Sequence, residues 1–210
     1  LFKKLVIGFL LDNIFYIQYY VSLFGVCVWG ACYALPAVVE KLYSRAASLK
    51  IYENLGFIFL VLAGPGFLMI LKSLMKPMFC IEDPDYFPYP VVLADKKVQC
   101  WGSTHLSLIW PGLIGLCIFF PSATLTTAIK YSPQEDVRFL FLYTRFEFIV
   151  KGLMLFFSLR FTNQPAVAML MLMLGSATII FILHSMKPCC LYWANRWKHF
   201  THVCNIWTCL

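Results

Sequence analysis

The chain has 210 residues, of which 61% are hydrophobic, 18% are aromatic and only 13% are charged. Soluble domains are about 25% charged, so a water-soluble globule is excluded as the main fold. The formal net charge is +7, but the basic residues are scattered over short connections rather than gathered in a patch. We therefore expect no nucleic-acid partner.

Long apolar runs, each close to the roughly 20 residues that a bilayer requires, predict membrane-spanning segments. Lipid offers the backbone no hydrogen-bond partners, and the runs lack the alternation of outer-membrane strands. The prediction is an all-α fold, a polytopic transmembrane helical bundle of about five spans plus a partial sixth, whose first partner is the lipid bilayer. The chain starts at Leu1 rather than a methionine, so we expect residues 1–210 to be a single membrane domain excerpted from a longer chain.

The first predicted span covers residues 5–35 and is ended by Pro36. The second covers residues 54–74 and is interrupted by the triplet Gly64, Pro65 and Gly66. Such a triplet breaks or kinks a helix, which favours a hinge. The alternative is a broken helix whose carbonyl groups coordinate ions, as in transporters.

A hydrophilic loop outside the membrane is predicted at residues 76–103, where prolines and acidic residues gather between Cys80 and Cys100. If this loop is extracytosolic, those two cysteines can form a disulfide. Cys189 and Cys190, beside a later span, are then candidates for cytosolic palmitoylation. Basic residues are divided almost equally between the two sides, so it is the cysteines that favour an extracytosolic loop at residues 76–103. The alternative of two unpaired loop thiols and two buried thiols stays open, because spacing alone proves little.

The remaining predicted spans are residues 105–129, 133–160 and 166–184, followed by a partial span at 191–210. The motif Ser132-Pro133-Gln134-Glu135 has the form of a capping box, which predicts that the fourth span begins at Pro133. Aromatic and basic residues alternate in the last segment, as is typical of a membrane interface.

Three charged residues, Arg145, Glu147 and Lys151, interrupt the apolar run of the fourth span. A charge at mid-bilayer costs at least about 2.5–3.5 kcal/mol, so such residues usually face protein or water. Glu147 and Lys151 are four residues apart and can pair on one helix face. They indicate either an ion pair that fixes helix packing or an ion-conducting or gating element.

Asp12 lies in the first span, one helical turn before Tyr16. If Asp12 pairs with Arg145 or Lys151 across helices, then Asp12, Arg145, Glu147 and Lys151 form one intramembrane polar network. The alternative is that Asp12 sits at headgroup level on a tilted helix. No ligand set at recognised spacing accompanies the histidines and no enzyme motif is present, so we expect no cofactor, no metal and no enzymatic activity.

The middle third of the chain resembles the membrane region of large multi-pass protist proteins of the tiny-macrocysts type, which also carry PAS sensor domains. The residues that carry the resemblance are, in order, Cys100-Trp101-Gly102-Ser103-Thr104-His105, Phe120-Pro121 and the segment from Arg138-Phe139 to Lys151. This resemblance implies a sensory role through a fused domain; the chain itself contains no PAS domain, and no residue roles follow from the likeness.

The expected function is therefore ion conduction, ion transport or transmembrane signalling within a larger protein, with other membrane subunits or further copies of the chain as partners. The alternative is a structural membrane anchor or accessory subunit of a large assembly. The residues do not indicate which membrane is involved.

Overall fold

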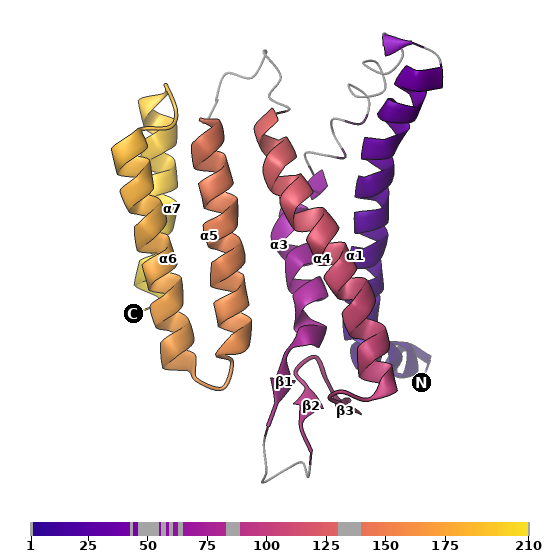
Figure 1. Cartoon of the computed structure of the whole chain (residues 1–210). Helices are drawn as coiled ribbons and strands as arrows, with labels where there is room; N and C mark the ends of the chain where they lie inside the picture. Colours follow the sequence, from indigo (N-terminus) through magenta and orange to yellow (C-terminus); the bar gives the residue numbers. More distant parts are fainter. Residues whose placement is uncertain are drawn as a thin grey trace. The chain divides into compact units, whose positions relative to one another are not determined.

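The structure is a computed structural model, shown in Figure 1. It describes residues 2–42, 44–45, 55, 58, 61–62, 65–82, 89–129 and 140–209, with most side chains in these ranges from Asn13 onward. The chain divides into two compact units, Leu1–Phe120 and Pro121–Leu210. Each unit has its own packed helices.

The first unit is built on α1 (Phe2–Leu42), α3 (Pro65–Met75) and the first part of α4 (Ser103–Ile129). Aromatic rings join these helices: the ring centroids of Trp29 and Phe119 are 5.5 Å apart, and those of Phe67 and Phe119 are 5.8 Å apart. The buried Tyr19 hydroxyl donates to the Leu108 carbonyl at 2.5 Å, which satisfies its polar tip. Contacts between aromatic side chains of α1, α3 and α4 therefore contribute much of the core of this unit.

Pro36 does not end the first helix, so that prediction is wrong. α1 continues through Pro36 to Leu42. The proline ring is fully buried. Proline removes one helical hydrogen bond, but spanning helices tolerate this where neighbouring groups compensate. Packing around Pro36 therefore outweighs the break that the sequence alone suggests.

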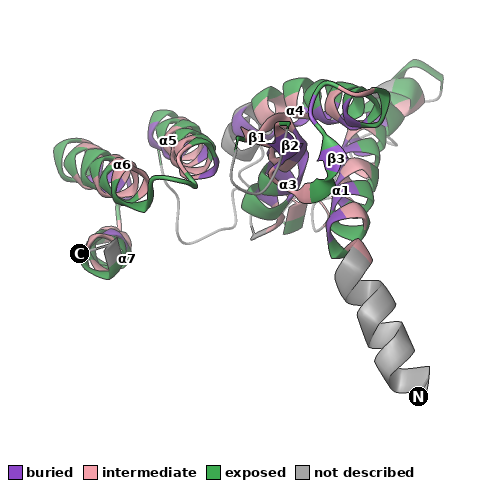
Figure 2. Cartoon of the chain, turned by 90° about the horizontal axis from the view of Figure 1, so that it is seen from below, coloured by how far each residue is buried: buried purple, intermediate pink, exposed green. Residues whose placement is uncertain are grey.

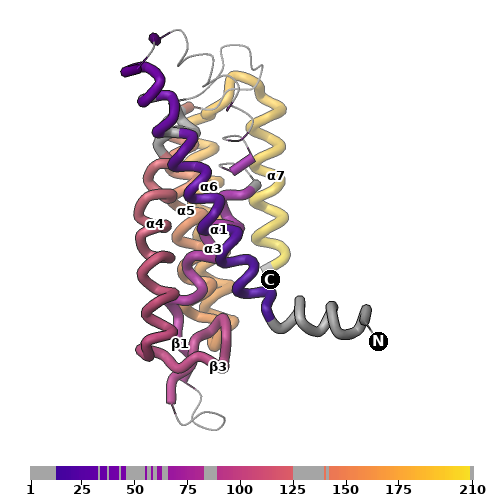
Figure 3. The backbone as a smooth tube through the Cα atoms, turned by 90° about the vertical axis from the view of Figure 1, so that its right-hand side faces the viewer, coloured from indigo at the N-terminus to yellow at the C-terminus, as the bar shows by residue number. Residues whose placement is uncertain are grey.

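The segment between α3 and α4 forms a small sheet, so the all-α prediction is wrong here. A 3-10 turn (Lys76–Met78) leads into β1 (Cys80–Ile81), β2 (Val91–Val92) and β3 (Asp95–Gln99), paired antiparallel in that order. Figure 3 shows these strands where α3 ends and α4 begins. Strands of two to five residues are too short to show alternation in the sequence, which explains the miss.

Two contacts hold the sheet in the first unit. Val92, Val98 and Cys100 form a buried cluster on the sheet. The Tyr16 hydroxyl of α1 donates to the Asp95 carboxylate of β3 at 2.8 Å. The sheet is thus tied to the flanking helix α1 rather than extended freely from the helices.

The second unit contains α5 (Phe141–Arg160), α6 (Pro165–Met186) and α7 (Tyr192–Cys209), consecutive helices joined by short turns. α6 packs against both α5 and α7. Its bounds agree with the predicted fifth span, and it ends at Lys187, which adopts the left-handed conformation with φ 43°. These three helices carry the charged cluster described below.

The predicted fourth span is shorter than expected. Its capping box, Ser132 to Glu135, lies outside the described residues. Leu140 is extended (φ −57°, ψ 134°), so a continuous helix over 133–160 is wrong and α5 begins at Phe141. The Leu140 N–H donates to the Pro188 carbonyl at 2.8 Å. Leu140 is thus bound to the α6–α7 connection.

Among the described residues, three helices are long and apolar enough to cross a membrane: Asn13–Leu42, Ser103–Thr124 and Pro165–Met186. These helices are compatible with an integral membrane protein. Five spans plus a sixth are not confirmed, because α3 has only 11 residues, α5 includes four charged residues and α7 is rich in polar groups.

The predicted helix break falls at the start of α3. Gly64 lies outside the described residues, and the helix begins at Pro65. A Cβ atom on Gly66 would stand 2.9 Å from the Val61 carbonyl oxygen, a backbone atom that cannot move aside on its own. Close backbone approach therefore requires glycine at position 66.

We predict that Gly66→Ala lowers the free energy of unfolding by about 1–3 kcal/mol, the usual cost of overpacking. Thermal unfolding in detergent micelles, followed by circular dichroism, measures the loss. Gly30→Ala is the matched control, because a Cβ there meets nothing within 4 Å and alanine favours the helix. Equal stability of the two variants would show that the approach of Val61 to Gly66 is not tight.

Candidate functional site

Glu147 lies in the second turn of α5 and is only 6% exposed. Lys151, one turn further along α5, donates from Nζ to Glu147 Oε1 at 2.6 Å. Lys198 of α7 donates from Nζ to Glu147 Oε2. A buried carboxylate is tolerated only when it is paired, and here each oxygen has its own ammonium partner.

Lys198 is the member of this cluster that the sequence analysis did not single out. It is 51 residues from Glu147, and no spacing rule connects them. One signal in the sequence points to it indirectly: Glu147 is the only acid in residues 140–209, against six lysines and arginines. The single carboxylate of these three helices is therefore the natural partner for their partly buried cations.

Two further side chains border the cluster, one from each helix. Tyr143 is 1% exposed, and the Lys198 ammonium lies 4.9 Å from the centre of its ring, within cation–π range. His202, one turn beyond Lys198 on α7, is 6% exposed. Its Nδ1 atom is buried without a hydrogen-bond partner among the described residues. We call Tyr143, Glu147, Lys151, Lys198 and His202 the ion cluster.

The other two members of the predicted network have different placements. Arg145 is half-buried on α5, and residues two apart in a helix do not face the same way, so it lies off the Glu147–Lys151 face. The Asp12 side chain lies outside the described side chains. Its pairing with the charges of α5 stays a prediction.

The unit around the ion cluster buries Glu147, the one carboxylate of its three helices, and exposes many large apolar side chains. Figure 2 shows exposed residues along α5, α6 and α7. Examples are Phe146, Ile149, Leu153, Phe156, Leu170, Leu174, Phe181, Trp193 and Trp197. A soluble domain rarely exposes so many large apolar side chains, whereas a unit in contact with lipid does.

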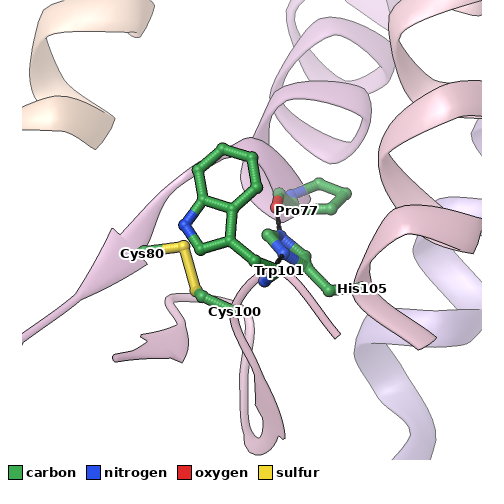
Figure 4. The surroundings of a disulfide bond; sticks show 5 residues. All are labelled: Pro77, Cys80, Cys100, Trp101 and His105. Carbon is green, nitrogen blue, oxygen red and sulfur yellow. Dashed lines mark hydrogen bonds between the residues drawn. A yellow bond between two sulfur atoms is a disulfide. The ribbon is translucent and has the colours of Figure 1, made fainter. Parts of the chain in front are cut away.

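A disulfide joins Cys80 and Cys100 across the sheet (Figure 4). The neighbouring cysteines Cys189 and Cys190 differ in their exposure to solvent. Cys189 is buried, and its backbone N–H and carbonyl both bond to the Asn195 side chain at 3.1 and 2.7 Å. Of the two predicted acylation sites, only Cys190 is exposed.

His105 locks the loop beside the disulfide. Its Nδ1 accepts the Trp101 N–H at 2.8 Å, and its Nε2 lies 2.7 Å from the Pro77 carbonyl, so the ring is the neutral Nε2–H tautomer (Figure 4). Cys80, Cys100 and His105 bring three potential metal ligands within 4.8 Å. The disulfide and the two hydrogen bonds already use these atoms, so the geometry is that of a structural lock.

We predict that His105→Leu costs about 2 kcal/mol of unfolding free energy, because it leaves the Trp101 N–H and the buried Pro77 carbonyl without their partner. Thermal unfolding of the purified chain tests this. Ser107→Ala is the control, since it removes only an exposed hydroxyl bond to the Thr104 carbonyl. A loss no larger than that of the control would mean that water replaces the imidazole.

No family model, no curated protein and no solved structure matches this chain.

Proposed function

We propose that the chain is the membrane domain of a larger protein, and that it conducts or transports ions or transmits a signal through the ion cluster of α5 and α7. The observation that carries this proposal is the buried carboxylate of Glu147, which two partly exposed ammonium groups share. It lies in a unit that exposes many large apolar side chains. Charges in such surroundings are costly and usually serve an ion path or a switch.

The two lysine partners of Glu147 support a role in gating, in which α5 and α7 change their arrangement. Lys151 on the same helix already neutralises the carboxylate, so packing alone does not require Lys198. Lys198 connects α5 to α7 through the second oxygen. We infer that Glu147 can release one lysine while it keeps the other, which gives the helix pair a second arrangement. A two-state element of this kind is what gating requires.

We infer that the disulfide-bearing segment faces an oxidising compartment, on the extracytosolic side, because disulfides persist there and not in the cytosol. The exposed Cys190 then suits cytosolic acylation. Of the forms that the function can take, signalling from a fused sensory domain is the one implied by the resemblance to the tiny-macrocysts proteins.

The double variant Glu147→Gln with Lys151→Met tests the proposal, because it removes the ion pair and leaves the net charge of the cluster unchanged. We expect at least a tenfold loss of ion flux in reconstituted vesicles, or of signalling in cells that express the whole protein, with assembly intact. Arg160→Gln, an exposed charge at the end of α5, is the control and retains activity.

Unchanged activity in the double variant would favour the rival function, a structural membrane anchor. One observation supports that rival: the i,i+4 spacing of Glu147 and Lys151 is a pairing that stabilises a helix by itself. In that case the variant lowers only the yield of the assembled complex. Size-exclusion chromatography of the solubilised complex separates the two results.

A further inference from the structure

The ion cluster contains more positive than negative charge. Glu147 contributes one negative charge, and Lys151 and Lys198 contribute two positive ones. Residues 140–209 contain no other acid that can balance the second lysine. The next acids along the chain, Glu135 and Asp136, lie outside the described residues. An excess charge of +1 in apolar surroundings is unfavourable unless a negative group completes it.

His202 supplies a second, independent sign of an unfilled position. Its ring is buried, and Nδ1 has no hydrogen-bond partner among the described residues, although buried polar atoms almost always have one. The titratable groups that act on it electrostatically are Glu147 and Lys151 from α5, and Lys198 and His199 from α7. A neutral imidazole can donate one N–H to a ligand.

We propose that the ion cluster binds a monovalent anionic group, held by the ammonium groups of Lys151 and Lys198 and by a ring N–H of His202. An added proton on His202 would raise the charge of the cluster from +1 to +2, and a divalent metal cation would raise it to +3, so both are disfavoured. One negative charge brings the cluster to neutrality. This inference rests on the proposed function in one respect, since it assumes that the cluster lies within the membrane.

The ligand can reach the site from the surface of the unit. The side chains of Lys151 and Lys198 are 35% and 28% exposed, whereas that of Glu147 is 7% exposed. Two sources share the required chemistry: a small free anion such as chloride, and the phosphodiester of an anionic lipid. Lysines near a membrane surface bind either, and their flexible stems can extend toward the headgroups.

The test is thermal unfolding of the whole chain in nanodiscs at constant ionic strength. In phosphatidylcholine, sodium chloride is compared with sodium gluconate, a much bulkier monoanion. A second arm adds phosphatidylglycerol in gluconate. We expect Tm to rise by about 3 °C or more with chloride if the ligand is a free anion, or with phosphatidylglycerol if it is a lipid.

Four variants make the test specific. Lys198→Met and His202→Leu should lose the rise, whereas His202→Gln, which keeps an N–H donor, should retain most of it. Arg196→Gln removes an exposed cation of the same helix that stacks on Tyr192, and should leave the rise unchanged. Glu147→Gln adds one net positive charge and should bind the anion at least threefold more tightly, which guards against loss through misfolding.

The inference is overturned if neither chloride nor phosphatidylglycerol raises the Tm of the unsubstituted chain, or if Arg196→Gln abolishes the rise as fully as Lys198→Met. Ion flux measured on the same samples keeps the two proposals apart. Anion binding without ion flux or signalling would contradict the proposed function and support the anion site. Ion flux or signalling without anion binding would contradict the anion site alone.

Discussion

Glu147→Gln should lower the stability of the α5–α7 unit by about 3 kcal/mol in gluconate buffer, because loss of one partner leaves the other charges of a buried pair uncompensated. Here Lys151 and Lys198 lose their shared carboxylate together. Both ammonium groups are partly exposed, so the loss should fall at the lower end of the range for buried pairs. Unfolding by increasing mole fraction of dodecyl sulfate in mixed micelles measures it.

A compensated variant is the control for this result. Glu147→Gln combined with Lys151→Met and Lys198→Met replaces the charges by groups of similar size, and should recover most of the loss, since a buried ion pair contributes little beyond its own desolvation cost. If Glu147→Gln unfolds at the same dodecyl sulfate fraction as the original chain, then the lysines reach water easily and the cluster is not a buried one.

Cys80→Ser should destabilise the first unit by a similar amount, about 3 kcal/mol. The disulfide to Cys100 closes a segment with a sequence separation of 20, and loop-closure entropy for that length gives this magnitude. The sheet strands contain only two to five residues each, so the strand pairing by itself holds the segment weakly. Thermal unfolding under non-reducing conditions measures the change.

Two controls accompany the cysteine variant. Reduction of the unsubstituted chain should reproduce the loss, and Cys117→Ser, at an exposed free cysteine of α4, should not. Rapid maleimide labelling of both Cys80 and Cys100 in the native, unreduced protein would show that the disulfide does not form. The predicted destabilisation would then have no basis.

Features set by local spacing could be predicted well. The i,i+4 order of Glu147 and Lys151 predicts their contact, because a helix brings such residues together wherever it lies. The apolar run at 166–184 predicts α6 to within two residues at each end. The end of the first span at Pro36 and the continuous helix over 133–160 were wrong: α1 continues through the buried Pro36, and Leu140 is extended, with its N–H bonded to the Pro188 carbonyl.

Length and hydrophobicity by themselves determined that this chain is mostly helical with segments suited to lipid, because every backbone polar group must be satisfied within such a segment. Only the tertiary structure decided that Lys198 shares the carboxylate of Glu147, that His202 is buried beside them, and that Tyr16 bonds to Asp95. These partners lie far apart along the chain, and their meeting depends on which helix faces pack, which no local pattern of residues encodes.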